Sequence, residues 1–238
     1  MQAANDQGAG ARPRVLVTGA TRGIGRSIVE LLSPDFSVVV AGRRPAEVDA
    51  LARGLPDAAG LVLDLSEPAS VEDRCAGLGD LDAVVHCAGT EGTAAAADLD
   101  TDFLATVLAV NLAGPVELTR VALPGLRRRG GRVVFVNSTA ASLTFPGWGA
   151  YSASKAALRA YADVLRLEER AHGVRVTSVF PGRTDTGMQR DIAAKRGTAF
   201  DPSTAMRPGS VAAAVRYALT TPADAEVTDL TIMPAPRA

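Results

Sequence analysis

Short runs of apolar residues recur along the chain, and segments with helical spacing separate them. The runs are rich in valine and do not alternate with polar residues, which is typical of strands that are covered on both faces. These runs predict strands at 15–17, 36–41, 61–63, 81–87, 132–137, 174–180 and 227–233. The helical spacing predicts two stretches within 98–129, separated near Gly114-Pro115, and further helices at 23–32, 46–53, 71–76, 150–171 and 211–219.

Strands and helices alternate almost throughout, which specifies a parallel sheet with right-handed crossovers. We therefore predict an α/β fold: a doubly wound parallel sheet of about seven strands with helices on both faces. No internal repeat or linker divides the chain, so residues 13–238 are expected to form one domain. Residues 1–12 lack an apolar signal core and are expected to be a disordered tail. No stretch is judged long and apolar enough to span a bilayer.

Composition and charge exclude several classes of function. A formal net charge of -1 gives no reason to expect nucleic acid or an anionic membrane as partner. Cys75, Cys87, His86 and His172 have no spacing that resembles a zinc site, so no metal is expected. No disulfide framework is needed, which favours a reduced, cytoplasmic protein. The basic run 127–129 is interpreted as a solvated helix end, where cations suit the helix dipole.

A glycine-rich turn joins the first predicted strand to the first helix. It reads Thr18-Gly-Ala-Thr-Arg-Gly-Ile-Gly25, with glycines at 19, 23 and 25. Glycines let the backbone approach a ligand closely, and the helix that follows presents unpaired N–H groups and a positive dipole end. The turn therefore predicts a pyrophosphate site, with a plain strand-to-helix turn as the alternative.

The second strand ends in Arg43-Arg44, where a NAD site would place an acidic residue. A guanidinium suits the 2′-phosphate of NADP through charge-assisted hydrogen bonds, and Arg22 could approach the same phosphate. We therefore expect NADP(H). The alternatives are an NAD-linked enzyme, or two arginines that simply lie in solvent.

Tyr151 and Lys155 open a long predicted helix, and residues four apart share one helical face. A nearby cation would lower the pKa of the phenol, so that it could donate and accept protons near neutral pH. Ser138 follows the fifth strand, where its hydroxyl could hold a substrate oxygen. Asn111 lies in the helical region after the fourth strand. The alternatives are a surface Tyr with a solvated Lys, and a core amide at position 111.

This set of residues resembles the short-chain dehydrogenase/reductase family, the single-domain Rossmann type with a Tyr-x-x-x-Lys motif. The resemblance extends from about residue 14 to 233. It rests on the glycine turn, Asp64-Leu65, Asn111, Ser138, Tyr151-x-x-x-Lys155 and Pro181-Gly182, in family order.

The resemblance implies a catalytic role for four of these residues. Tyr151 would be the general acid/base, and Lys155 would lower its pKa and bind the nicotinamide ribose. Ser138 would orient and polarise the substrate carbonyl, and Asn111 would hold a water in a proton relay.

The resemblance and the two motifs together imply a set of cofactor contacts. The expected cofactor-binding residues are Gly19, Thr21, Arg22, Gly23, Ile24, Gly25, Arg43, Arg44, Asp64, Leu65, Cys87, Ala88, Gly89, Tyr151, Lys155, Pro181, Gly182, Thr184 and Thr186. Two positions depart from the family: Thr184 replaces a more usual aliphatic residue, and Cys87-Ala88-Gly89 stands where Asn-Ala-Gly is usual. A thiol cannot make the hydrogen bonds of an amide, so the support of this turn is expected to differ.

The expected function is NADP(H)-dependent interconversion of a carbonyl and a secondary alcohol. Phe145, Trp148 and Met188 are candidate substrate contacts, with a subunit contact as the alternative for Trp148. A cofactor-binding sensor without catalysis remains the alternative from another class. The family also implies a homotetramer or homodimer.

Overall fold

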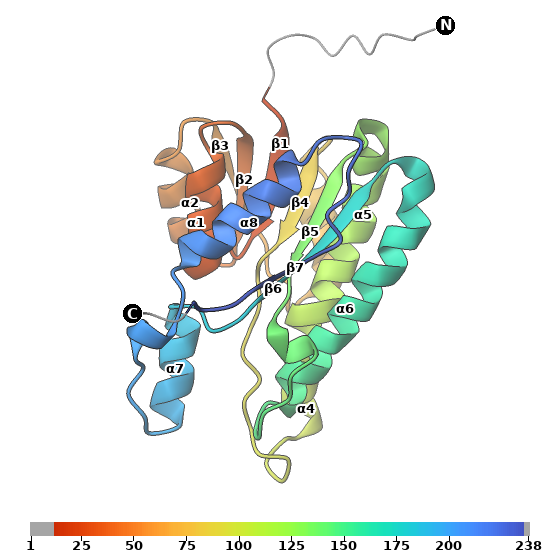
Figure 1. The fold of residues 1–238 in the computed structure, drawn as a ribbon. Coiled ribbons are helices and arrows are strands. Elements are labelled where there is room, and N and C mark those ends of the chain that lie inside the picture. Colours follow the sequence, from red (N-terminus) through yellow and green to blue (C-terminus); the bar gives the residue numbers. More distant parts are fainter. Residues whose placement is uncertain (1–11, 236–238) are drawn as a thin grey trace, which may run out of the picture.

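The computed structural model describes residues 12–235, so residues 1–11 of the expected tail lie outside the described part. All seven strands join one parallel sheet in the order β3-β2-β1-β4-β5-β6-β7, as Figure 1 shows. The prediction of a doubly wound α/β sheet is therefore confirmed. The strands are β1 Arg14–Thr18, β2 Ser37–Gly42, β3 Ala58–Val62, β4 Ala83–His86, β5 Arg132–Val136, β6 Arg175–Pro181 and β7 Asp229–Ile232.

Helices cover both faces of this sheet and create two separate apolar cores. One core joins the sheet to α1 (Gly23–Leu32), α2 (Pro45–Arg53) and α8 (Pro208–Thr220). The other joins it to α3 (Val71–Cys75), α5 (Gly114–Arg129) and α6 (Gly149–Glu169). In β1, for example, Val15 and Val17 enter the first core and Leu16 the second. Strand residues still alternate between faces, and the runs are continuously apolar because both faces are buried.

The two helical stretches predicted within 98–129 form one continuous helical run. The turn Ala109–Ala113 is π-helical and connects α4 (Thr101–Leu108) directly to α5. The expected break near Gly114-Pro115 is wrong, because the wider turn accommodates a proline that clashes in a regular helix. Gly114 is needed for another reason: a Cβ there would lie 2.6 Å from the Leu65 carbonyl oxygen.

This helical run also corrects the expectation about bilayer-spanning stretches. Residues Thr101–Arg129 are long and apolar enough to cross a membrane by length and composition, with a mean hydropathy of 1.2 over the best 18-residue window. Helices that pack on a sheet can pass the same test. Here the run packs on β4, α3 and α6.

Edge strands and one helix also differ from the prediction. The strand expected at 61–63 lies at Ala58–Val62, because it is an edge strand whose outward residues are exposed and carry little apolar signal. Helix α7 (Gly187–Lys195) was not predicted as a helix. Figure 1 shows α4 and α7 projecting beyond the carboxyl edge of the sheet.

Two features near β4 and α5 refine the sequence-based interpretation. His86 ends β4 as a buried strand residue; it stacks on Phe135 at 4.7 Å, and its Nε2 lies 2.9 Å from Thr119 Oγ1. Burial lowers its pKa to about 3. The basic run at the end of α5 is not simply solvated, because its side chains pair with Glu169, Asp80 and Asp82.

Candidate active site

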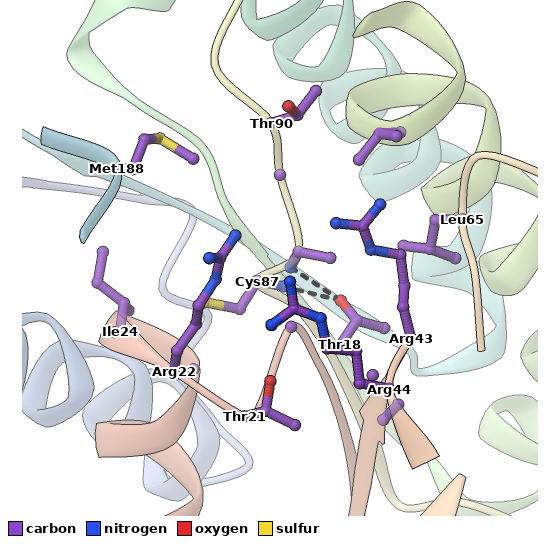
Figure 2. Close-up of a pocket in the computed structure, with 18 of the residues that line it drawn as sticks. Thr18, Thr21, Arg22, Ile24, Arg43, Arg44, Leu65, Cys87, Thr90 and Met188 are labelled. Atoms are coloured by element: carbon purple, nitrogen blue, oxygen red, sulfur yellow. Dashed lines mark hydrogen bonds between the residues drawn. The ribbon is translucent and has the colours of Figure 1, made fainter. Parts of the chain in front are cut away.

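The glycine turn after β1 packs tightly against the turn that follows β4. Gly19 has a φ of 64°, and a Cβ there would lie 2.7 Å from the Ala88 Cα. A Cβ on Gly25 would lie 2.2 Å from the Gly19 carbonyl oxygen. Thr18 Oγ1 accepts hydrogen bonds from the backbone N–H groups of Cys87 (3.0 Å) and Ala88 (3.1 Å), drawn as dashed lines in Figure 2. Only glycine fits these positions, and the two turns form one rigid floor.

A cavity of about 470 Å³ opens above this floor, at the carboxyl edge of β1, β2 and β4. The cavity and the bare glycine backbone fit the pyrophosphate of a dinucleotide at the N-terminus of α1. Most of the expected cofactor contacts line it: Gly19, Thr21, Arg22, Gly23, Ile24, Gly25, Arg43, Arg44, Asp64, Leu65, Cys87, Ala88, Gly89 and Thr186. Met188, expected to contact substrate, lines the same cavity.

Three arginines and four carboxylates line this cavity: Arg22, Arg43, Arg44, Glu47, Asp64, Glu91 and Asp191. In Figure 2, Arg22 and Arg43 extend into the pocket from the glycine turn and from the end of β2. Arg44 is paired with Glu47, at 2.6 Å, and the Arg44 hydrogen bond lowers the pKa of the Glu47 carboxyl. Glu47 also lines the cavity and was missed by the sequence reasoning. Arg44 is therefore partly neutralised, which leaves Arg22 and Arg43 as the cations for a phosphate.

Five other expected cofactor contacts do not line this cavity: Tyr151, Lys155, Pro181, Gly182 and Thr184. Pro181 ends β6 and pairs with Ile232 of β7, and the Gly182 N–H donates to the Ile232 carbonyl at 2.8 Å. Thr184 is buried, and its hydroxyl donates to the Gly182 carbonyl at 3.0 Å. These residues shape the chain that leads to Thr186, whose hydroxyl caps α7.

Tyr151 lies in the first turn of α6 and faces Ser138, which follows β5. The phenol is 8% exposed. Burial raises the pKa of Tyr151, and a hydrogen bond from Ser138 offsets part of that rise. The prediction of a lowered pKa is therefore wrong for this structure, because desolvation outweighs the favourable contacts. The phenol is protonated at neutral pH and is suited to donate a proton.

Lys155 lies one turn further along α6 and is buried beneath Tyr151. Its Nζ lies 5.8 Å from the centre of the Tyr151 ring and donates to the Val136 carbonyl at 3.3 Å. Burial lowers the pKa of Lys155 to about 8. A Cβ on Gly89 would lie 3.8 Å from this Nζ and 3.3 Å from Asn111 Oδ1. Because Gly89 has no side chain, its backbone, which lines the cavity floor, lies next to both Lys155 and Asn111.

Asn111 connects the π-helical turn to this pair. Its Oδ1 accepts from the Thr90 N–H at 2.8 Å, and its Nδ2 donates to the Thr90 carbonyl and to Ser154 Oγ, both at 3.0 Å. The Ser154 hydroxyl then donates to the Tyr151 carbonyl at 2.7 Å. The structure thus brings Asn111, Ser138, Tyr151 and Lys155 into one cluster, which adjoins the cavity at Gly89.

Two residues of this network were not predicted. Ser154 is three positions after Tyr151, so its helical spacing could have revealed it. Asn137 precedes Ser138, and its Nδ2 donates to the Lys155 carbonyl at 3.1 Å. Its partner lies on another element, so no local spacing pointed to that contact.

The Cys87 substitution is compatible with this arrangement. The turn after β4 is held through the backbone N–H groups of Cys87 and Ala88, so the missing amide is not needed for these two bonds. Burial raises the pKa of the Cys87 thiol to about 12. The thiol is therefore neutral and serves as part of the cavity wall.

The two expected aromatic substrate contacts extend outward from Tyr151. The Trp148 ring lies edge-on to Tyr151 at 5.3 Å, and Phe145 lies 5.8 Å beyond it. Phe145 lines a second cavity rather than the first. Together these rings form a wall that leads away from the phenol.

A glycine floor at the carboxyl edge of a doubly wound sheet, beside a buried Tyr–Ser–Lys cluster, defines a Rossmann-fold oxidoreductase. Residues 13–197 match the family described as short chain dehydrogenase. The chain is 33% identical over 225 residues to the uncharacterized short-chain type dehydrogenase/reductase y4eK of Sinorhizobium fredii, covering 92% of this chain and 90% of that protein. The chain belongs to the short-chain dehydrogenase/reductase family.

Solved structures of similar fold carry dinucleotides. A serine dehydrogenase complexed with NADP+ is 30% identical, with a TM-score of 0.84 over 93% of this chain and 94% of that one. An alcohol dehydrogenase of Thermococcus sibiricus complexed with 5-hydroxy-NADP is 26% identical, with a TM-score of 0.83 over 95% of this chain and all (100%) of that one. The fold is therefore shared with enzymes of this family across nearly the whole chain.

Proposed function

We propose that this protein is an NADP(H)-dependent oxidoreductase that interconverts a carbonyl and a secondary alcohol. The observation that carries the proposal is the buried Tyr151, which is hydrogen-bonded to Ser138 and has the Lys155 ammonium 5.8 Å from its ring centre, next to the cavity floor at Gly89. A phenol and a hydroxyl that can donate to one oxygen atom, with a cation nearby, suit acid–base chemistry on a carbonyl.

In reduction, Ser138 and Tyr151 donate hydrogen bonds to the substrate oxygen as negative charge develops on it. Tyr151 then transfers its proton to that oxygen, and in the oxidative direction it takes the proton back. Lys155 is the nearby cation that favours the deprotonated phenol left behind. Asn111 holds the turn after β4 against α6 and would order the water that resupplies the proton. The nicotinamide cofactor, when bound, supplies or accepts the hydride.

The preference for NADP(H) over NAD(H) rests on charge. Arg22 and Arg43 line the end of the cavity where β2 stops, and a second phosphate there would gain charge-assisted hydrogen bonds. Glu47 lines the same end and would favour a ribose hydroxyl instead. Arg44 offsets Glu47 through their ion pair, and within residues 12–235 no ion pair involves Arg22 or Arg43, so these two guanidinium groups remain for a phosphate. The two cofactor-bound structures described above, which carry NADP+ and 5-hydroxy-NADP, support the same choice.

The test compares the wild-type protein with Tyr151→Phe. Wild type should consume NADPH with some members of a broad panel of ketones and aldehydes. The phenylalanine variant should lose turnover by about 100- to 10,000-fold, which is the usual contribution of a positioned acid, and keep its NADPH affinity. Full activity of the variant would refute Tyr151 as the acid. Tight NADPH binding without any turnover would favour a sensor, and a preference for NADH would favour an NAD-linked enzyme.

A further inference from the structure

A second cavity, of about 500 Å³, lies beyond the aromatic wall of the catalytic site. Three segments that are distant in the sequence enclose it: the chain after β4, the loop before α6 and the end of α7. Its lining residues are Thr93, Ala94, Ala95, Phe145, Pro146, Gly147, Lys195 and Arg196. Most of this lining is apolar or backbone, apart from Thr93 and the two cations at one end.

The two cations differ in how they are compensated. Lys195 forms an ion pair with Glu91, whose carboxylate also accepts two hydrogen bonds from Thr93. Arg196 instead donates to the Pro146 carbonyl at 3.4 Å and lies over the Trp148 ring, 5.6 Å from its centre. Within residues 12–235, no carboxylate forms an ion pair with Arg196. The cavity therefore contains one guanidinium whose charge is not neutralised by the described part of the chain.

Arg196 is separated from the catalytic phenol by a single aromatic ring. Trp148 contacts both groups: its ring centre lies 5.6 Å from the guanidinium carbon and 5.3 Å from the centre of the Tyr151 ring. Phe145, which is 50% exposed, packs on the same indole. The indole N–H of Trp148 is buried and has no acceptor among the described residues, so the wall also holds an unused donor. An apolar surface thus connects the phenol to an uncompensated cation.

We infer that this cavity binds an anionic group of the substrate, with Arg196 as the residue that recognises it. The substrate class is a carbonyl compound with a carboxylate at the far end of an apolar spacer. The spacer lies along Trp148 and Phe145, and the carbonyl reaches Tyr151. A guanidinium is suited to this role because it binds a carboxylate through two parallel hydrogen bonds. A hydroxy acid as small as serine could not span an indole ring. This inference rests on the proposed function, whose substrate it specifies.

A binding experiment tests the anion site without any turnover. Trp148 is the only tryptophan of the chain, so its fluorescence reports on this wall. Protein loaded with NADP+ is titrated with octanoate and with octanamide, which have the same length and differ in charge. Octanoate should bind at least about 10-fold more tightly, as expected for a charge-assisted pair.

Variants then assign the effect to Arg196. Arg196→Gln should abolish the preference for octanoate, and Arg196→Lys should retain part of it because the charge remains. Arg170→Gln, an exposed arginine at the end of α6 far from the cavity, is the matched control and should behave as wild type. Equal binding of the two probes by wild type, or a preference that survives in Arg196→Gln, would overturn the inference.

A turnover experiment separates this inference from the proposed function. Straight-chain methyl ketones with a terminal carboxylate, from levulinate to longer homologues, are each compared with their methyl ester. The ratio of kcat/KM for acid over ester should rise with chain length in wild type and fall to about one in Arg196→Gln. Reduction of acids and esters alike by both proteins would refute only the anion site. If no ketone is reduced, the proposed function fails, and the fluorescence titration still decides the anion site.

Discussion

The cofactor cavity and the neighbouring Tyr151 cluster differ in the kind of groups they present and in how deeply these groups are buried. On the side of β1, β2 and α1, binding depends on bare glycine backbone and on exposed arginines that extend into the cavity. On the side of β4, β5 and α6, the key side chains are buried: Asn111 is 0% exposed and Lys155 3% exposed. Each of these buried groups is hydrogen-bonded to another element. The proposed cofactor site is therefore a surface, and the proposed catalytic site is a part of the core.

This difference determines what a substitution does. An exposed arginine contributes little to the folded state, so its loss changes only affinity. A buried polar group is tied to the packing around it, and leaving its partners unpaired destabilises the whole fold. Variants on the cofactor side should therefore alter binding alone, and variants on the catalytic side should alter turnover and stability together.

The largest expected effect is on turnover in Lys155→Met. Loss of the ammonium beside Tyr151 should lower kcat by about 100- to 10,000-fold, which is the usual range for such acid–base assistance. The apolar side chain should nevertheless fold well, because no charge needs to be buried. Steady-state kinetics with any reduced ketone checks the first effect. Unaltered kcat would contradict the role given to Lys155.

The same variant has a pH dependence with a defined sign. The pKa of Lys155 is about 8 in the folded protein, below its ordinary value of 10.5. Below pH 8 the folded protein holds a buried charge at full cost, and between pH 8 and 10.5 it releases a proton that the unfolded chain keeps. Wild type should therefore gain stability relative to Lys155→Met as the pH rises through this window, by on the order of 1 kcal/mol per unit. Denaturant unfolding of both proteins at pH values on each side of 8 measures this.

A smaller but global effect is expected for Asn111→Leu. The substitution leaves the N–H and carbonyl of Thr90 without their partner inside the protein, which should reduce the free energy of unfolding by about 2–4 kcal/mol. Ser154→Ala removes one hydroxyl of the same network and should cost about 1 kcal/mol. Urea unfolding gives both values. Equal costs for the two variants would show that the Thr90 contacts are not important.

On the cofactor side, Arg43→Ala should weaken NADPH binding by about 10- to 100-fold, as expected for loss of a charge-assisted phosphate contact. Arg44→Ala should weaken it by only about two- to threefold, since that side chain is already paired with Glu47. Neither variant should change NADH affinity or the urea midpoint. Fluorescence titration with each cofactor checks this, and an equal loss of NADH binding would argue against a phosphate contact.

The smallest effect is expected for Glu47→Gln. Removing this carboxylate frees Arg44 and lowers the negative charge of the cavity, so NADPH affinity should rise by about two- to threefold. The affinity ratio of NADPH to NADH, measured by the same titration, is the quantity to follow. A fall in this ratio would mean that Glu47 orients Arg44 for the phosphate rather than competing with it.

The two sides also differ in how much of them could be predicted. The glycine turn and the Tyr–Lys pair depend on spacing within one segment, and local geometry determines which groups meet. The central strands were predicted because both of their faces are buried and the apolar signal is continuous. The edge strand β3 was misplaced, because one face of it meets solvent and the pattern is weaker.

What escaped prediction depends on contacts between distant segments. Glu47 lines the cavity because α2 packs beside it. Asn137, which follows β5, donates a hydrogen bond to the Lys155 carbonyl of α6. The raised pKa of Tyr151 likewise follows from burial, which spacing does not report. The second cavity is lined by three segments that lie far apart in the sequence, and no sequence pattern indicated that they come together.

The buried imidazole of His86 limits the stability of this protein at low pH. Its folded pKa of about 3 lies below its ordinary value of 6.5, so between these values only the unfolded chain takes up the proton. Stability should therefore decline as the medium is acidified from 6.5 toward 3, by on the order of 1 kcal/mol per unit. Thr119 Oγ1 donates to the Pro115 carbonyl and so accepts from Nε2, which leaves Nδ1 to take the added proton. Nδ1 is buried and has no hydrogen-bond partner among the described residues, so a charge there would destabilise β4, the strand that leads to the floor of the catalytic site. Acid should thus inactivate this protein by opening its centre, because Tyr151 and Lys155 already carry their protons well above the pH at which His86 is charged.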